Sequence, residues 1–246
     1  MFKLIKPATG IRQSSLLLPF SYEIVRSPRR RSISIEVRAA EVVVRAPMRV
    51  PERELHDFVR EKSRWIVQKI AAQQQHIDSL PRRTYSAGSV FPYLGRTLTL
   101  SLVMAASASV ELIDDCLRVG LSSRSRLAPE EQARRLIYVW YQQQALSILS
   151  ARTSALTVQM GLRCSAVTIR ATRSKWGHCT SRGAIQYNWQ IILAPEAIVD
   201  YLVAHEVCHL RHPNHSQAFW QFVAGVCPTY KQDRAWLKAR GAHLVL

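Results

Sequence analysis

The sequence predicts an α+β protein: a β-rich part with one long helix over residues 1–125, then a mainly helical part with a small sheet over residues 126–246. Two observations predict this class. Apolar residues alternate with polar ones through much of the first half, and they recur at three- and four-residue steps in most of the second. The 246 residues, 48% of them hydrophobic, supply apolar material for one sizeable core or two small ones. This composition excludes a collagen-like, mucin-like or largely disordered chain.

Strands are expected in three regions. Residues 21–46 have the alternation of a β meander, and alternation returns over about 84–121, where Gly88 and Gly95 mark turns. Residues 165–193 are expected to add two more strands, the second of which is AIQYNWQIIL. The first half is therefore predicted to be mostly sheet.

Helices are expected in five regions. Residues 51–77 and about twenty residues from Pro129 carry apolar side chains at helical spacing. A third helix runs from Pro195 and should end by His212, because Pro213 disfavours helical geometry at the preceding residue. Helices over 214–226 and 229–240 complete the chain. The C-terminal third therefore has a helix, break, helix pattern.

The net charge is strongly positive. The chain has 34 Lys+Arg against 17 Asp+Glu, a formal net charge of +17. A surplus of this size attracts polyanions, so nucleic acid, nucleotides and acidic proteins are candidate partners. No helix-turn-helix, zinc knuckle or aromatic ribonucleoprotein motif accompanies the charge, so any contact with nucleic acid is expected to be non-specific.

The chain is expected to be cytoplasmic. No apolar run approaches the roughly 18 residues of a bilayer-spanning helix, so no contact with a membrane is predicted. The N-terminal MFKLIKPATG lacks the continuous apolar region of a secretory signal. The 5 cysteines include no CxxC pair, which is typical of scattered reduced thiols.

Four of the 8 histidines are clustered in the segment HEVCHLRHPNH. Because His205 and His209 are four residues apart on an expected helix, both imidazoles emerge from one face and can share one ion. Glu206 can reach a water on that ion without binding the ion itself. This spacing is typical of zinc hydrolases, in which two imidazoles hold Zn²⁺ and the glutamate takes a proton from the water. The alternative is a buried histidine pair satisfied by hydrogen bonds, which would cost desolvation free energy without a cation.

A catalytic zinc site needs a third protein ligand and one open position. His212 would lie about 10 Å from His205 along the helix axis at 1.5 Å per residue, too nearly in line to close a tetrahedron. His215 lies beyond the Pro213 break, so the chain can fold it back over the metal. We therefore expect His215 to be the third ligand and His212 to lie at the surface or behind a ligand.

The C-terminal third also resembles a known family. The stretch RSKWGHCTSRGAIQYNWQIILAPEAIVDYLVAHEVCHLRHPNHSQAFW resembles the YgjP-like metallopeptidase family, relatives of the SprT-like and other minimal gluzincin-type zinc proteases. The similarity extends from about Tyr22 to Leu237 and includes RRRSISIEVR and VREKSRWI. It implies a zincin-like catalytic domain over residues 126–246.

The resemblance also implies roles for individual residues. The metal ligands that it implies are His205, His209 and His215, and the catalytic residue is Glu206. One departure concerns a family segment that is usually W-G-S-C-S. This chain has His178 in place of the first serine and Thr180 in place of the second, and we expect the change at His178 to be inconsequential.

A mechanism follows from these parts. Zn²⁺ lowers the pKa of its bound water to about 7, and Glu206 accepts the proton as that water attacks the substrate. The resulting oxyanion needs a donor besides the metal, and the candidates are Tyr187, Asn188 and Arg173. Tyr187 and Asn188 alternate along an expected strand, so each can instead face the core or a neighbouring strand.

Two further features concern the surroundings of the site. Residues 184–189, AIQYNW, are a candidate edge strand that an extended peptide substrate could join by β-augmentation. Trp189, Trp220 and Trp236 are interpreted as core packing rather than as platforms for substrate.

Three functions are consistent with this reading. The first is a zinc-dependent metallopeptidase acting on peptides or proteins. The second is a metal-dependent nucleotide pyrophosphatase or phosphohydrolase, for which the 27 arginines would be a natural complement. The third is a basic nucleic-acid-associated protein with a structural metal. The HExxH segment does not distinguish a carbonyl from a phosphoryl target.

Overall fold

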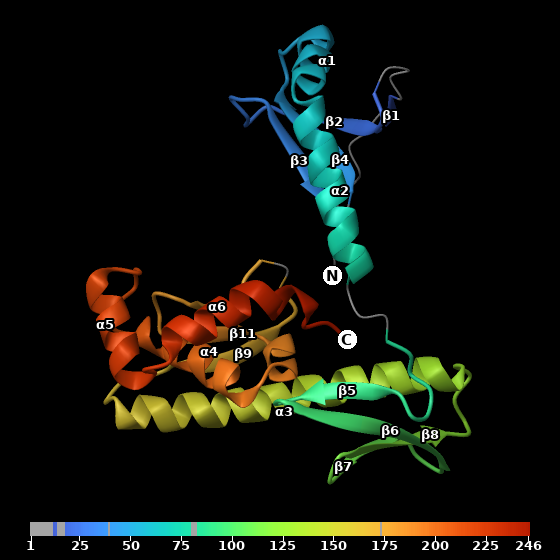
Figure 1. Ribbon diagram of the computed structural model, residues 1–246, viewed down its shortest axis with the longest axis vertical. Helices are drawn as coiled ribbons and strands as arrows, with labels where there is room; N and C mark the ends of the chain where they lie inside the picture. Colours follow the sequence, from blue (N-terminus) through green and yellow to red (C-terminus); the bar gives the residue numbers. More distant parts are fainter. Residues whose placement is uncertain (1–11, 14–17, 39, 80–82, 173) are drawn as a thin grey trace. The chain divides into compact units, whose positions relative to one another are not determined.

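The computed structural model describes five stretches of the chain. These are residues 12–13, 18–38, 40–79, 83–172 and 174–246. They form an α+β fold with three small mixed sheets and six α-helices, as Figure 1 shows. The predicted α+β class is confirmed at this level.

The chain divides into two compact units, Met1–Leu80 and Pro81–Leu246. The boundary expected near residue 125 falls inside the second unit and stays a prediction. The sheet that precedes that point shares one buried core with the helices that follow it.

The first unit holds a four-stranded sheet in the order β1-β2-β4-β3. Its strands are Arg12–Gln13 (β1), Tyr22–Ser27 (β2), Ser34–Arg38 (β3) and Glu41–Pro47 (β4). β3 pairs antiparallel with β4, but β2 pairs with β4 in parallel on the other side. The predicted meander is therefore wrong in strand order, because alternation shows which face of a strand is buried and not which strand lies beside it.

Two helices follow in place of the single one expected over residues 51–77. They are Glu52–Glu61 (α1) and Ser63–Ser79 (α2), separated at Lys62. The prediction missed the break because the apolar spacing continues across it. Leu55 and Val59 of α1 and Ile66 of α2 are all fully buried in the same cluster.

The second unit begins with a four-stranded sheet in the order β5-β6-β8-β7. Its strands are Val90–Tyr93 (β5), Arg96–Ala105 (β6), Ser109–Ile113 (β7) and Cys116–Ser122 (β8). Gly95 has φ +85° in the turn between β5 and β6, and Gly88 has φ +84°. The strands and glycine turns expected over 84–121 are confirmed, since both glycines adopt the left-handed conformation that side chains disfavour.

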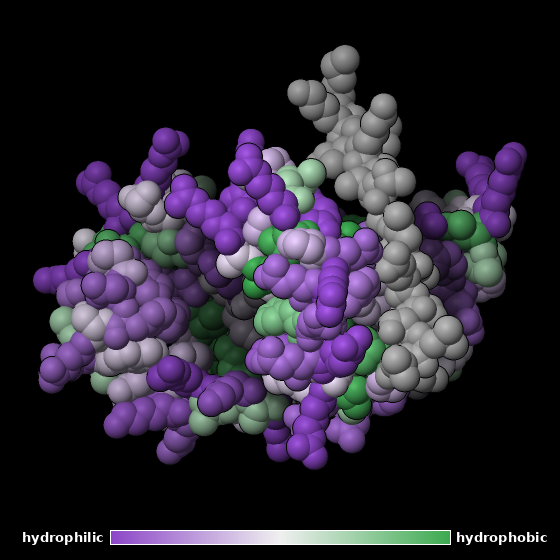
Figure 2. Space-filling view, turned by 90° about the horizontal axis from the view of Figure 1, so that it is seen from above, coloured by the Kyte–Doolittle hydropathy of each residue, from purple (hydrophilic) through white to green (hydrophobic). Residues whose placement is uncertain are grey.

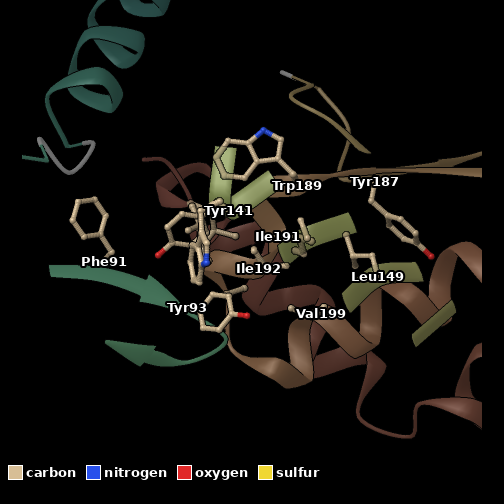
Figure 3. Close-up of a cluster of buried hydrophobic side chains, with 14 of the residues drawn as sticks. Phe91, Tyr93, Tyr141, Leu149, Tyr187, Trp189, Ile191, Ile192 and Val199 are labelled. Atoms are coloured by element: carbon tan, nitrogen blue, oxygen red, sulfur yellow. The ribbon is translucent and has the colours of Figure 1, made fainter. Parts of the chain in front are cut away.

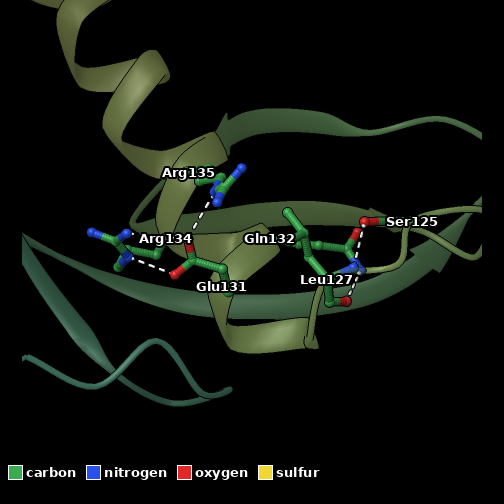
Figure 4. Close-up of polar contacts among 6 residues, drawn as sticks. All are labelled: Ser125, Leu127, Glu131, Gln132, Arg134 and Arg135. Carbon is green, nitrogen blue, oxygen red and sulfur yellow. Dashed lines mark hydrogen bonds and ion pairs between the residues drawn. The ribbon is translucent and has the colours of Figure 1, made fainter.

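The long helix α3 spans Pro129–Gln159, 31 residues where about twenty were expected. Figure 4 shows its first turn, where Glu131 accepts hydrogen bonds from Arg134 and Arg135. The last third of the helix was missed because its buried face includes Thr153 and Thr157, which do not contribute to an apolar pattern.

A three-stranded sheet follows in the order β10-β11-β9. The strands are Ala166–Arg170 (β9), Gly177–Cys179 (β10) and Ala184–Asn188 (β11). β11 pairs in parallel with β9 and antiparallel with β10, so it is the central strand.

The strand predicted to continue to residue 193 instead ends at Asn188. The Asn188 side chain accepts a hydrogen bond from the Gln190 backbone and begins a 3₁₀ helix over Trp189–Leu193. This helix carries Trp189, Ile191 and Ile192 into the main core, drawn in Figure 3. Local capping by an asparagine therefore overrides the strand pattern.

Three helices complete the fold: Glu196–Cys208 (α4), Gln217–Val226 (α5) and Tyr230–Arg240 (α6). The expected helix, break, helix pattern is confirmed. The start of α5 differs, because the hydroxyl of Ser216, not Asn214, accepts the capping hydrogen bond from the Phe219 backbone.

The surface carries many hydrophilic side chains. They cover most of the face seen in Figure 2, in line with the net charge of +17. Within the described stretches, no helix has both the length and the apolar character that crossing a bilayer requires.

Candidate metal centre

Helix α4 carries the HExxH segment and is buried on nearly all sides. Leu202, Val203 and Val207 are each at most 3% exposed, as expected for a helix that is apolar around its circumference. His205 lies in the last turn of α4 and His209 follows as its C-cap residue. The two rings lie 4.9 Å apart between centroids, so the four-residue spacing brings them to one side.

The loop after α4 brings His215 to the same place. Nε2 of His215 lies 3.0 Å from Nε2 of His205. Within the part of the chain that the structure describes, one ligand-capable nitrogen from each of His205, His209 and His215 lies within 4.8 Å of the others. Three imidazoles thus converge, two from the C-terminal end of α4 and one from the end of the loop before α5.

His212 contributes through its backbone. The carbonyl oxygen of His212 lies 2.9 Å from Nδ1 of His209 and accepts its hydrogen bond. This contact fixes the His209 ring and leaves Nε2 as its nitrogen for a ligand contact. The imidazole of His212 faces Phe222, 5.4 Å away between ring centroids. His212 therefore lies behind His209, a predicted ligand, which is one of the two positions expected for it.

The environment favours neutral imidazoles, the protonation state that binds metals. Burial and the neighbouring His209 and His215 lower the pKa of His205 to about 3. Burial and His209 also lower the pKa of His215. In the described part of the chain, the buried Nδ1 of His205 has no hydrogen-bond partner. The donor set therefore fits a cation that is held by imidazole nitrogens.

Aromatic residues hold His215 from behind. Its ring stacks on Trp220 at 5.5 Å, and Trp220 stacks on Tyr230 at the same distance. The guanidinium of Arg234 lies 4.7 Å from the centre of the Trp220 ring, a cation–π contact. Trp220 thus packs inside the fold, as expected, and also supports a predicted ligand.

Glu206 is buried beside the three histidines. The residue is only 4% exposed. Burial raises the pKa of its carboxyl to about 8, and the positive charge of Lys175 partly offsets this increase. A carboxyl group with this pKa can exchange a proton near neutral pH. Glu206 packs against Gly177 of strand β10.

A cavity of about 470 Å³ opens over these groups. Its walls come from β10 and the residues before it, from α4 and the loop after it, and from α6. The lining residues are Lys175, Trp176, Gly177, His178, Cys179, Tyr201, Leu202, His205, Glu206, His209, Pro213, His215 and Leu237. This size is within the range of cavities that hold a small ligand or one segment of a larger one.

Two of the three candidate oxyanion donors, Tyr187 and Asn188, do not line this cavity. Tyr187 is fully buried and its hydroxyl is hydrogen-bonded to Thr153 at 2.8 Å. The Asn188 amide donates to the carbonyl of Thr172 and accepts from Gln190. Tyr187 and Asn188 are therefore structural, the alternative that the sequence left open, and Arg173 lies outside the described residues.

The cavity includes residues that the sequence analysis missed. Tyr201 is four residues before His205, with the two rings 5.9 Å apart, and burial raises the pKa of its hydroxyl to about 12. The i−4 spacing from the first histidine was the signal that could have found it. His178 is exposed on β10 and lines the cavity, but it is not one of the three grouped histidines.

Comparison with known proteins identifies the family of the chain. The family described as YgjP-like, metallopeptidase domain, matches residues 31–240. Among solved structures, the chain is similar to the metallopeptidase zymogen abylysin of Pyrococcus abyssi. The identity is 23%, covering 37% of this chain and 93% of that one, with a TM-score of 0.33. A search of curated proteins gave no match.

Proposed function

Because the chain belongs to the YgjP-like metallopeptidase family, we propose that it is a zinc-dependent peptidase with a zincin-like catalytic domain in the C-terminal half. The observation that carries this proposal is the group of three histidine nitrogens within 4.8 Å of one another, with the buried Glu206 beside them. Two of the histidines come from the HExxH segment, and the third comes from the loop between α4 and α5.

His205, His209 and His215 are the proposed zinc ligands. Three neutral imidazoles are an established donor set for catalytic zinc and leave one coordination position open. When bound, zinc would supply a Lewis acid that polarises the scissile carbonyl and lowers the pKa of a water. The hydrogen bond to the His212 carbonyl and the stack on Trp220 orient the His209 and His215 rings for this role.

Glu206 is the proposed general base. Its carboxylate would accept a proton from the attacking water and pass it to the leaving amine. Its position supports this role, because it follows His205 directly in the chain, lines the cavity and is held against β10. Tyr201, whose hydroxyl stays protonated well above neutral pH, is the proposed donor to the oxyanion, because it is a cavity-lining residue with an O–H group beside His205.

The edge strand β10 is the proposed docking site for the substrate backbone. The candidate strand AIQYNW corresponds mainly to β11, which has β9 on one side and β10 on the other and so offers no free edge. β10 is at the sheet edge and lines the cavity. The Thr180 and Asn188 backbone N–H groups bond across the β10–β11 pair. The antiparallel alternation then turns the backbone groups of Gly177 and Cys179 outward, toward a peptide.

The test is hydrolysis of casein by the zinc-loaded full-length chain. We expect cleavage that stops on removal of zinc by a chelator and is lost in Glu206→Gln, which should still bind zinc. Release of pyrophosphate from nucleoside triphosphates is measured in parallel with the same preparations. Pyrophosphate release without casein cleavage would contradict the peptidase proposal and favour a phosphohydrolase.

A further inference from the structure

Strand β10 lies against helix α4 at Gly177 and Glu206. A Cβ atom added to Gly177 would lie 2.5 Å from Cδ of Glu206 and 2.6 Å from its Cγ. Carbon atoms that are not bonded have their optimal separation at about 3.5–4.0 Å, so no side chain fits between the strand and the glutamate as they stand. The strand backbone itself is therefore one wall of the Glu206 site.

The backbone conformation does not explain the glycine. Among the glycines that the structure describes, those with positive φ are Gly88, Gly95, Gly161 and Gly183, and Gly177 is not one of them. Gly177 lies in a strand and pairs with Tyr187, a setting in which glycine weakens the fold relative to residues with side chains. A glycine at this position is therefore explained by the lack of room for a Cβ atom between β10 and the Glu206 side chain.

We propose that Gly177 is a positioning residue, whose missing side chain lets β10 lie against Glu206 and hold its carboxylate in place at the cavity. Glu206 is 4% exposed and packs from α4 against Gly177 of β10. A methyl group at position 177 would therefore displace the carboxylate rather than find free volume. The catalytic part of this inference rests on the proposed function, whereas the steric part does not.

The arrangement has a consequence for the reaction. Gly177 turns its backbone groups to the free edge where a peptide would pair, and the same residue touches the proposed general base. One residue thus sets the distance between the substrate backbone and the carboxylate. A displacement of about 1 Å can lower a rate by about 100-fold, so this contact matters for the rate more than for binding.

The steric part is tested by a double-mutant cycle on the zinc-free full-length chain, which needs no activity. G177A should lower the Tm of the wild type by about 2–8 °C, as overpacking in a unit of this size implies. It should lower the Tm of E206Q by as much, because glutamine keeps the atoms that the methyl group would meet. In the E206A background the same change should leave the Tm unchanged or raise it by a few degrees, because those atoms are gone and alanine suits a strand better than glycine.

An equal loss of Tm in the wild-type and E206A backgrounds would overturn the proposal. If G177A alone does not fold, the cycle still decides: G177A/E206A folds if Glu206 is the obstacle and fails to fold if the strand itself rejects alanine. Gly225→Ala is the matched control, because a Cβ there meets nothing within 4 Å. It lies in helix α5 and should not lower the Tm in any background.

The positioning role is tested after zinc loading. G177A should bind as much zinc as the wild type and have a similar KM for casein, while kcat falls about 10- to 100-fold. The positioning role would be overturned if G177A lowers the Tm only when Glu206 is present, yet leaves kcat unchanged. If the wild type does not cleave casein, the proposed function is wrong. The Tm values of the double-mutant cycle would still test the contact between Gly177 and Glu206, because they need no activity.

Discussion

The two units of the chain bury different kinds of residue. The core of the first unit is apolar, and its Glu36 carboxylate is partly exposed and paired with Arg30, Arg38 and Arg45. In the part of the chain that the structure describes, the buried polar or charged residues all lie in the second unit. They are Thr153, Thr157, Asn188, Glu206 and Asp233.

This difference shows which observations lead to a functional site. Positive charge is present in both units, with 15 Lys+Arg against 8 Asp+Glu in the first and 19 against 9 in the second, so charge alone does not single out either one. Burial of an ionisable group costs free energy, whereas exposed arginines stay solvated at little cost. A buried carboxyl beside three imidazoles therefore indicates a functional site, and exposed arginines do not. The second unit is therefore the place to look for chemistry, and each prediction below tests this contrast.

The largest expected effect is the loss of turnover in Glu206→Gln. Removing the general base should lower kcat for casein about 10³- to 10⁴-fold with zinc content unchanged. The matched change in the first unit is Glu54→Gln, at an exposed position in α1, which should leave kcat unchanged. Steady-state kinetics on both variants decides, and full activity of Glu206→Gln would refute the assigned base.

The second effect is on the pH dependence of stability in the zinc-free chain. The folded-state pKa of Glu206 is raised to about 8, so between about pH 4.5 and pH 8 the folded chain binds more protons than the unfolded chain and becomes less stable as pH rises. His205, with its pKa lowered to about 3, has the opposite effect but only below about pH 6.5. Between pH 6.5 and 8 the free energy of unfolding should thus fall by about 2 kcal/mol.

Denaturant unfolding at a series of pH values measures this change. In Glu206→Gln the decrease between pH 6.5 and 8 should vanish, because glutamine does not titrate. A wild-type curve that is flat over this range would mean that Glu206 is ionised in the folded chain and would remove one argument for its role as base.

The third effect concerns the free edge of β10. Cys179→Pro removes an outward-facing N–H group and should raise KM for casein about tenfold, since one hydrogen bond to substrate is lost. Cys179→Ala keeps the N–H group and is the matched control, with KM expected within about twofold of wild type. Equal KM values for the two variants would contradict pairing of the substrate with this strand.

The smallest effect is expected from Trp220→Ala. Without the stack that supports His215, zinc affinity should fall about tenfold or less, because the ligands themselves are kept. Competition with a chromophoric chelator measures this affinity. Trp65→Ala, which removes an exposed indole of the first unit, should leave zinc affinity unchanged.

The sequence predicted some parts of the site well because their geometry is local. The spacing of His205 and His209 on one helix, and a chain break that lets His215 return, depend on helix geometry alone. Contacts that depend on the packing of distant segments were not predictable in this way. The pairing of β2 with β4, and the central place of β11, are set by tertiary structure and left no periodic pattern in the chain.

Other misses have local physical reasons. The Asn188 cap ends β11 within a run of residues that favours a strand. The role of Gly177 was hidden because a glycine in a strand normally indicates a bulge or a turn, whereas here the observation that explains it is the nearby Glu206 side chain. Arg173, the third candidate donor to the oxyanion, lies outside the described residues.

The most direct test of the account is the zinc content of the full-length chain. The chain is saturated with zinc, passed through a desalting column and analysed by mass spectrometry, together with His215→Ala and His178→Ala. The account predicts one zinc per chain in the wild type, clear loss in His215→Ala, and no loss in His178→Ala, whose histidine lines the same cavity outside the group of three. A wild-type chain that retains no zinc, or a His215→Ala variant that retains it fully, would contradict the three-histidine centre.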